Sequence, residues 1–357
     1  MRRTRKIALL RYAEYNCAAR YFVEHGLHGE YILQPPSTRR TEELGERYSP
    51  DFACTPFKTI LGSMIEALEC GADTLVTPHG FCRLGYYGEL QEQILRDLGY
   101  EFDFVNLAEY ATGKKKDWLR VAKRLDPELN LPKAARAGAD TIRMVACIDE
   151  ITAEYYQNCG FEAASGAYRQ AYQRFLSALR TADARSEIEE AYRRVKDELS
   201  AIPLNKPPCP LRVGIIGDLY TAMDAFSNRE IERKLSEMRV EVHRWMNITH
   251  RLIRYSGEKN LNVGIQELCT YEMGPTSTAN IWCAKEYARR GFDGIVHVKG
   301  ANCTPEIDIV PVLRRISAEY RIPLLCLTYD AQTSEVGLMT RLEAFYDMID
   351  GRKRVML

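Results

Sequence analysis

Short apolar runs alternate along the chain with longer segments in which apolar residues recur every three or four positions. The apolar and β-branched runs predict seven strands, at residues 7–12, 74–78, 102–107, 212–216, 240–245, 294–298 and 324–328. Periodic segments between them predict helices, such as one from Thr55 to near Gly71 and one over residues 87–98 that ends at Gly99. This alternation is typical of βαβ units and a parallel sheet.

The middle of the chain differs in character. Residues 134–200 are charged and predict helices, although the apolar run 142–148 is compatible with either a helix or a strand. Residues 203–210 contain four prolines and predict a linker. We therefore expect an α/β fold with two parallel-sheet α/β lobes and a helical insert. The expected parts are an N-terminal α/β lobe (residues 1–133), a mainly helical segment (134–202), and a linker with a C-terminal α/β lobe (203–357).

Composition excludes several classes of protein. The 357 residues are ample for a hydrophobic core, and 49 Lys and Arg balance 49 Asp and Glu. Without a net positive field, neither nucleic acid nor an anionic membrane is an expected partner. No apolar run approaches the roughly 20 residues of a membrane helix, and residues 7–10 are too short for a signal-peptide core. We expect a cytoplasmic protein.

The chain has eleven cysteines, and disulfides are not expected in a reducing compartment. Burial, metal binding or catalysis must therefore account for these cysteines. The absence of any Cys-x-x-Cys pair disfavours zinc ribbons, thioredoxin-type pairs and ferredoxin-type clusters. Four cysteines lie in apolar periodic segments and are expected to be small buried side chains: Cys70, Cys147, Cys283 and Cys326.

Three other cysteines lie where loops lead into helices. Cys54 and Cys303 each open a Cys-Thr-Pro tripeptide, in which threonine predicts the helix N-cap and proline the first helical residue. A cysteine just outside a helix N-terminus favours the thiolate that iron or zinc requires. Cys82 follows the run 74–78 as Cys303 follows 294–298, and ligand sites of open α/β sheets lie beyond the carboxyl ends of strands. The three cysteines are expected in strand-to-helix loops and predict a shared metal site, although capping alone also explains threonine and proline.

Several motifs accompany these cysteines in order along the chain: Cys54-Thr-Pro-Phe-Lys58, Gly71-Ala-Asp73, Cys82-Arg-Leu-Gly-Tyr-Tyr87, Cys303-Thr-Pro-Glu-Ile307, Asp330 and Thr340-Arg-Leu-Glu-Ala-Phe345. Together they resemble the iron–sulfur component family of the 2-hydroxyacyl-CoA dehydratases. This group includes double-cubane cluster proteins and acyl-CoA dehydratase activase-related proteins. The resemblance spans most of the chain and is weakest in the helical middle and the linker.

The resemblance implies that Cys54, Cys82 and Cys303 bind an iron–sulfur cluster. The cluster is either a [4Fe-4S] cluster or a double-cubane [8Fe-9S] cluster. The chain is shorter than the dehydratase pattern and has additional cysteines, so the sequence does not distinguish these two cluster types. In the family, one electron at very low potential forms a ketyl radical on a 2-hydroxyacyl thioester and acidifies its β-hydrogen. A separate ATP-hydrolysing activator supplies that electron, which agrees with the absence here of a Gly-x-x-x-x-Gly-Lys-Ser/Thr loop. A homodimer or a heterodimer with a related subunit is implied.

Other residues near the three cysteines have two interpretations each. Lys58, Arg83 and Lys299 either offset the negative charge of a cluster or are solvated surface charges. His79, Tyr86 and Tyr87 flank Cys82, either as hydrogen-bond donors around a cluster or as aromatic packing. The segment Val213-Gly-Ile-Ile-Gly217-Asp218 follows dinucleotide-binding spacing only loosely and predicts a tight strand-to-helix turn.

The expected function is therefore low-potential reduction or radical dehydration of a small or CoA-linked substrate. One alternative is a non-catalytic electron-relay or cluster-assembly subunit that partners a catalytic homologue. Another is a CoA-thioester binding module without metal. The sequence assigns no catalytic acid or base.

Overall fold

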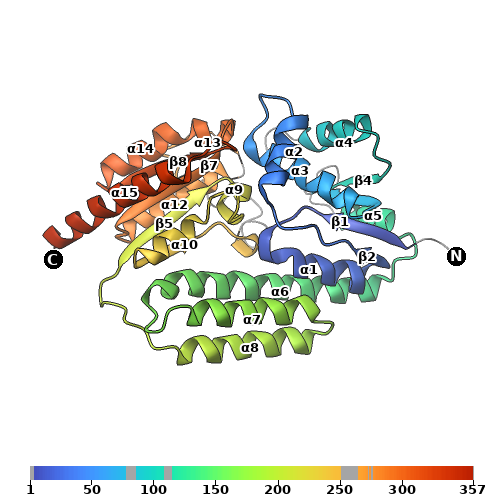
Figure 1. Cartoon of the computed structure of the whole chain (residues 1–357), viewed down its shortest axis with the longest axis horizontal. Coiled ribbons are helices and arrows are strands. Elements are labelled where there is room, and N and C mark those ends of the chain that lie inside the picture. The colour runs from blue at the N-terminus through green and yellow to red at the C-terminus, as the bar shows by residue number, and fades with distance from the viewer. Residues whose placement is uncertain are drawn as a thin grey trace. The chain divides into compact units, whose positions relative to one another are not determined.

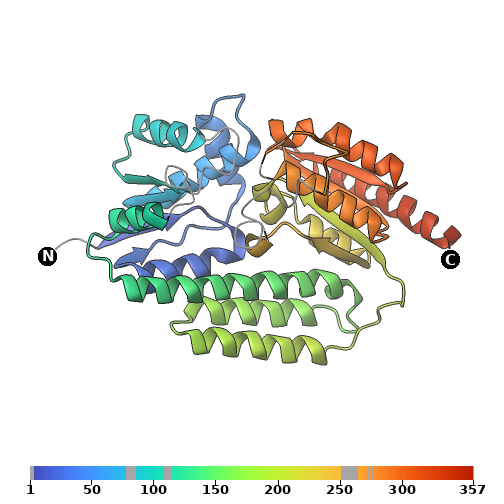
Figure 2. The ribbon, with the colours of Figure 1, turned by 180° about the vertical axis from the view of Figure 1, so that it is seen from behind.

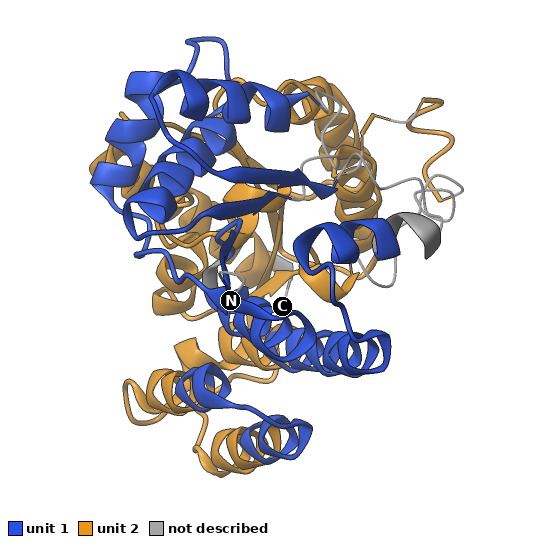
Figure 3. Cartoon of the chain, turned by 90° about the vertical axis from the view of Figure 1, so that its right-hand side faces the viewer, with its two compact units in different colours: residues 1–148, 176–191 blue, residues 149–175, 192–357 orange. Residues whose placement is uncertain are grey.

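The computed structural model of the chain confirms the expected α/β architecture, with two four-stranded, all-parallel sheets (Figure 1). The structure describes residues 4–77, 86–107, 115–250, 264–271, 273–274 and 276–356. The chain divides into two compact units (Figure 3). The first unit comprises Met1–Ile148 and Leu176–Ala191, and the second comprises Asp149–Phe175 and Tyr192–Leu357.

The sheet of the first unit has the strand order β2-β1-β3-β4. Its strands are β1 (Arg5–Leu9), β2 (Gly29–Tyr31), β3 (Thr74–Thr77) and β4 (Asp103–Asn106). Three of them were predicted, whereas β2 was not. This edge strand has only three residues, which are too few for an alternating pattern to be recognised in the sequence. Because all the strands are parallel, the segments that follow them leave from the same edge of the sheet.

Helices of the first unit pack on this sheet and on one another. They are α1 (Asn16–Tyr21), α2 (Arg39–Tyr48), α3 (Thr55–Glu69), α4 (Tyr87–Asp97) and α5 (Lys115–Leu125), and a π-helix follows α1 at Phe22–Gly26. Val23 and Val121 pack with Val76 and Val105 in one apolar cluster. On α2 and α3, glycines permit close backbone contact: a Cβ at Gly62 would lie 2.0 Å from the carbonyl oxygen of Thr41.

The sheet of the second unit repeats this topology in the order β6-β5-β7-β8. Its strands are β5 (Leu211–Gly217), β6 (Val240–Arg244), β7 (Gly294–Gly300) and β8 (Leu324–Tyr329), all of which were predicted with slightly different bounds. Two apolar clusters form the core of this unit. One joins the sheet to α10 (Ile231–Glu237) and α15 (Glu335–Met356), and the other joins it to α12 (Ser277–Arg289) and α14 (Val310–Glu319).

Three helices lie between β4 and β5 in the sequence and contribute residues to both units: α6 (Leu131–Asn158), α7 (Ala167–Thr181) and α8 (Arg185–Ala201), which Figure 2 shows in green. The ambiguous run 142–148 lies within α6 and is helical. In the first unit, Arg143 of α6 forms a bidentate ion pair with Glu189 of α8, at 2.8 and 2.7 Å. In the second, Tyr155 of α6 stacks on Tyr172 of α7. The predicted helical segment 134–202 is thus helical, and its helices are shared by the two units.

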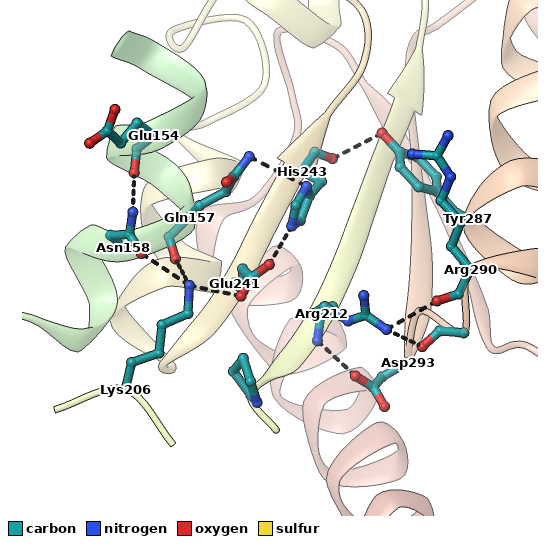
Figure 4. Close-up of polar contacts among 12 residues, drawn as sticks. Glu154, Gln157, Asn158, Lys206, Arg212, Glu241, His243, Tyr287, Arg290 and Asp293 are labelled. Atoms are coloured by element: carbon teal, nitrogen blue, oxygen red, sulfur yellow. Dashed lines mark hydrogen bonds and ion pairs between the residues drawn. The ribbon is translucent and has the colours of Figure 1, made fainter. Parts of the chain in front are cut away.

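The proline-rich segment 203–210 is anchored to the second unit rather than loosely connected to it. Lys206 Nζ donates to Gln157 O and Asn158 Oδ1, both at 3.0 Å, and pairs with Glu241 Oε2 at 2.8 Å (Figure 4). Burial alone would raise the pKa of Glu241, but hydrogen bonds from His243 and Lys206 lower it to about 2. Main-chain hydrogen bonds of Pro203 O with Ala163 N and of Asn205 N with Phe161 O also hold the segment, at 2.9 and 2.7 Å, so Lys206 is one of several contacts that fix it.

Two further sequence predictions concern the glycine motif at the end of β5 and membrane-spanning helices. The glycine motif forms the end of β5, and Asp218 alone leads from it into a five-residue helix, α9 (Leu219–Met223); a Cβ at Gly217 would lie 1.9 Å from Val298 O. This glycine therefore serves strand packing. Among the helices formed by the described residues, none combines the length and apolar character needed to cross a membrane.

Candidate functional site

Two cysteines precede helices that begin in the same way, one in each unit. Cys54 precedes α3 and Cys303 precedes α13 (Thr304–Asp308); both are half-buried and have extended backbone angles. Their carbonyl oxygens accept the first helical hydrogen bonds, from Lys58 N at 3.2 Å and Ile307 N at 3.0 Å. Each cysteine adjoins a first turn whose N–H groups lack an acceptor within the helix. This position stabilises a thiolate.

The Cys-Thr-Pro tripeptides differ by one residue from the expected capping pattern. Cysteine itself is the N-cap residue, threonine is the first helical residue and proline the second. Proline fits there because neither of the first two helical N–H groups has an intrahelical acceptor. Cys303 follows β7 through a short loop, as expected. The expected strand-to-helix loop is wrong for Cys54, which lies between α2 and α3 because α2 intervenes after β2.

Cys82, His79 and Arg83 lie outside the described residues, so their predicted roles stay predictions. Beyond that segment, Tyr87 is buried and packs edge to face against Phe57, with ring centroids 4.7 Å apart. Gln91 Nε2 donates to Phe57 O at 3.0 Å. Tyr86, which is half-exposed, packs against Tyr87, so aromatic packing is the observed role of both tyrosines. These contacts fasten the start of α4 to the first turn of α3, the helix that Cys54 precedes.

The convergence of the three cysteines on one centre also stays a prediction, because Cys54 and Cys303 belong to different compact units. Within the described ranges, no group of three or more His, Cys, Asp or Glu side chains is placed to hold a metal ion. The structure does show that Cys54 and Cys303 are both N-cap residues of helices.

A buried polar cluster lies directly beside Cys303 in the second unit, and we call it the Glu306 cluster. It comprises Glu306 of α13, His297 of β7, and Thr276, Ser277 and Asn280 at the start of α12. The two Glu306 oxygens accept from Asn280 Nδ2 at 3.1 and 2.9 Å, and Oε1 also accepts from the Thr276 and Ser277 hydroxyls at 3.0 Å. His297 Nε2 lies 2.8 Å from Glu306 Oε2, and both side chains have 0% exposure.

The Glu306 cluster contains a buried ion pair between His297 and Glu306. Burial alone would lower the pKa of His297, but hydrogen bonding to Cys326 and Glu306 raises it to about 9. His297 is therefore an imidazolium at neutral pH, balanced by the Glu306 carboxylate. Because His297 is on β7 and Glu306 is on α13, this pair fixes the short helix against the strand that precedes it.

The cluster also ties together the carboxyl ends of β5 and β7. Asn280 Nδ2 donates to Gly217 O at 2.8 Å, and Gly217 N donates back to Asn280 Oδ1 at 3.1 Å. Asp218 Oδ2 accepts from Gly300 N at 2.9 Å, and burial raises the pKa of this carboxyl group. The loop that carries Cys303 thus leaves from a strand end held by two buried side chains.

The predicted charge-compensating lysines have different environments. Lys58 pairs with Glu46 of α2 at 2.6 Å, so a carboxylate already compensates its charge. Lys299 lies on β7, four residues before Cys303, and only 8% of it is exposed. Its interpretation as a solvated surface residue is therefore wrong. No carboxylate of the described residues lies within ion-pair distance of it, and its charge would be stabilised by an anion beside Cys303.

The remaining cysteines separate into buried and accessible ones. Cys147 and Cys283 are buried as expected, and burial raises the pKa of the Cys283 thiol. The expectation is wrong for Cys70, which is exposed because it caps the C-terminus of α3 beyond the buried face, and Cys326 on β8 is only half-buried. Of the cysteines given no role, Cys17 is buried, Cys159 and Cys269 are half-buried and Cys209 is exposed.

The sequence analysis missed the Glu306 cluster although it contained two signals. His297 is a polar residue inside the apolar strand Gly-Ile-Val-His-Val-Lys-Gly, and Glu306 belongs to the Cys-Thr-Pro-Glu motif. Their nine-residue separation and the contribution of α12 could not be read from either motif alone. Comparison of the sequence with models of protein families finds no match, and comparison with proteins of curated function finds none either.

Proposed function

We propose that this chain is an iron–sulfur protein resembling the 2-hydroxyacyl-CoA dehydratase components, with Cys54, Cys82 and Cys303 as cluster ligands. The observation that carries this proposal is the matched placement of Cys54 and Cys303, each half-buried as the N-cap of a helix with proline in its first turn. A thiolate is the form of cysteine that binds iron, and both positions stabilise it.

Residues around Cys303 support an anionic ligand there. Lys299 brings a poorly exposed positive charge to the strand that leads to Cys303. The Glu306 cluster holds α13 against β7 and so fixes the backbone position of Cys303. A bound cluster would supply one electron at low potential, for reduction or radical dehydration of a small or CoA-linked substrate. Cys54, Cys82 and Cys303 would hold that cluster, and Lys299 would contribute to the charge around it.

Two kinds of partner belong to this proposal. A separate ATP-hydrolysing activator would donate the electron, because the sequence contains no P-loop motif of its own. A second copy or a related subunit would complete a homodimer or heterodimer. The cluster type, [4Fe-4S] or [8Fe-9S], is decided by measuring iron and acid-labile sulfide.

Anaerobic purification of the full chain tests the cluster. We expect a brown protein with roughly four irons per chain for a single cubane or roughly eight for a double cubane. Cys54→Ser, Cys82→Ser and Cys303→Ser should each lose iron and the sulfide-to-iron absorption band. The exposed residues Cys70 and Cys209 provide matched controls, and Cys70→Ser and Cys209→Ser should keep both. Full iron content in all three ligand variants would refute the assignment.

The second candidate is a non-catalytic electron-relay or cluster-assembly subunit. The same cysteine placement would serve this function equally well. No residue in the described part of the chain is identified as a catalytic acid or base, which a subunit of this kind does not need. Supplying the isolated holoprotein with activator, ATP and 2-hydroxyacyl-CoA esters distinguishes the two. Turnover by this chain alone excludes a purely accessory role, whereas turnover only after a homologous subunit is added supports it.

A further inference from the structure

A pocket of about 340 Å³ lies in the first unit and contains none of the three predicted cluster ligands. Its walls come from α1, from α7, and from the segments that follow β1 and β2. Arg11 comes two residues after the end of β1, and Leu33 two residues after the end of β2. The pocket thus lies beyond the carboxyl ends of adjacent parallel strands, where open α/β sheets bind ligands, and its volume suits a small molecule.

Three arginines and one glutamate give the pocket an excess of positive charge. Arg20 is compensated, since its Nη1 lies 2.5 Å from Glu24 Oε2 and 3.3 Å from Asp183 Oδ1. Arg11 and Arg180 differ from it: within the described ranges, neither has a carboxylate at ion-pair distance. Their two charges exceed the single negative charge that Glu14 contributes to the lining.

Arg11 is held in place by main-chain groups that leave its charge uncompensated. Its Nη1 donates to the carbonyl oxygens of Gln34 and Pro35. Gln34, which is 5% exposed, is fixed in turn: its Nε2 donates to Leu9 O at 2.8 Å, and its Oε1 accepts from Ser63 Oγ at 3.3 Å. A guanidinium whose Nη1 is oriented by carbonyl oxygens keeps its Nη2 N–H groups to donate to an oxyanion.

The rest of the lining is largely apolar. Leu33, Tyr31 and Leu176 form much of the wall, and Leu33 is 60% exposed. Cys17 also lines the pocket, but burial raises the pKa of its thiol to about 12, and its Sγ donates to Glu14 O at 3.0 Å. Cys17 therefore remains a neutral thiol at pH 7, which adds no negative charge and is a poor nucleophile.

We infer that this pocket binds a small organic oxyanion, a carboxylate or phosphate with a short apolar body, through Arg11 and Arg180. The oxyanion would contact the guanidinium groups, and the apolar body would cover Leu33 and Leu176. This inference does not depend on the iron–sulfur proposal, because the pocket contains neither Cys54 nor any residue of the second unit. The pocket is a binding site and not a site of covalent chemistry.

Titration calorimetry on the full chain at low ionic strength tests this inference, with sodium hexanoate and phenyl phosphate as anionic probes and hexanol as a neutral one. Arg180→Gln is the principal variant, because Arg180 is exposed and has no hydrogen bond or ion pair to other described residues, so the fold should tolerate it. Arg136→Gln removes the same charge from an exposed site on α6 outside the pocket and is the matched control.

We expect at least one anion to bind the wild-type protein and hexanol not to bind. Arg180→Gln should weaken anion binding about tenfold, and the Arg11→Gln/Arg180→Gln double variant should abolish it, while Arg136→Gln leaves it unchanged. Hexanoate and phenyl phosphate distinguish a carboxylate from a phosphate ligand, and binding of either supports the site. The inference fails if neither anion binds, or if Arg180→Gln and Arg136→Gln bind equally well.

Discussion

The two cysteine-headed helices are held in place by different kinds of interaction. In the first unit, α3 has 15 residues, and most of them, from Phe57 to Leu68, are buried. In the second, α13 has only five residues, and Glu306 is its buried one. Apolar packing and close glycine contacts hold α3, whereas one carboxylate with donors from two other elements holds α13.

This difference follows from how much apolar surface each helix buries. Glu306 is the only buried residue of α13, so the hydrophobic effect, which contributes roughly 25 cal/mol per Å², does little to position this helix. Directional hydrogen bonds to a buried charge position it instead. A long helix such as α3 does not need them, although it also contains a buried carboxylate, that of Glu66. The two cysteines should therefore respond differently to loss of packing and to loss of polar contacts.

Loss of the Glu306 carboxylate should have the largest effect. Glu306→Ala removes the charged partner of buried His297 and leaves several buried donors unsatisfied, and it should cost about 3–5 kcal/mol of unfolding free energy. Glu66→Ala should cost roughly 1–2 kcal/mol, because Arg40, its charged partner, is 55% exposed and can be solvated. Urea unfolding of both variants measures the difference. Equal losses would contradict the distinction between the two helices.

The pH dependence of the free energy of unfolding tests whether the His297–Glu306 ion pair stabilises the second unit. The folded pKa of His297 is about 9, above its ordinary value of 6.5. The resulting stabilisation is fully present below pH 6.5 and is lost as the pH rises through 9, with a total of about 3 kcal/mol. The free energy of unfolding of the wild-type protein should therefore decline over that interval, and His297→Gln should flatten the decline. A profile unchanged by His297→Gln would show that the imidazolium is not stabilised in the fold.

Local patterns predicted the strands and the cysteine positions because both depend on residues close in sequence. Apolar runs identified seven strands, and Cys-Thr-Pro identified two helix starts to within one residue. The edge strand Gly29–Tyr31 was missed because its three residues are too few to show a strand pattern. Its strand conformation depends on pairing with β1. Cys70 was misjudged because helical periodicity does not show where the buried face ends.

The Glu306 cluster illustrates why the polar part of the site was not predictable. Its members come from β7, α12 and α13, and only the fold brings Asn280 within hydrogen-bond distance of Glu306. A buried histidine in an apolar strand indicated that a partner must exist, since an unpaired buried polar group is costly. It did not indicate which carboxylate would be that partner.

A glycine substitution tests the packing of α3. In Gly62→Ala, the new Cβ would lie 2.0 Å from Thr41 O, a backbone atom that cannot rotate away, so α2 and α3 must separate. We expect a loss of roughly 2–3 kcal/mol. Gly351→Ala is the matched control in α15, where the new methyl group meets nothing within 4 Å and should stabilise the helix by up to about 1 kcal/mol. Opposite signs for the two variants support the proposed packing, and a neutral Gly62→Ala would contradict it.

The smallest effect should come from a buried hydrogen bond between α2 and α3. Thr41 Oγ1 donates to Glu66 Oε2 at 2.8 Å and accepts from Thr38 N at 3.0 Å. Thr41→Val keeps the shape but removes both bonds, and because Arg40 still pairs with Glu66, the loss should be about 1 kcal/mol. Thr340→Val on the exposed face of α15 controls for the residue change and should be nearly neutral. If Thr41→Val destabilised the protein as much as Glu306→Ala, α3 would depend on polar anchoring just as α13 does, because a helix positioned by packing should tolerate the loss of one hydrogen bond.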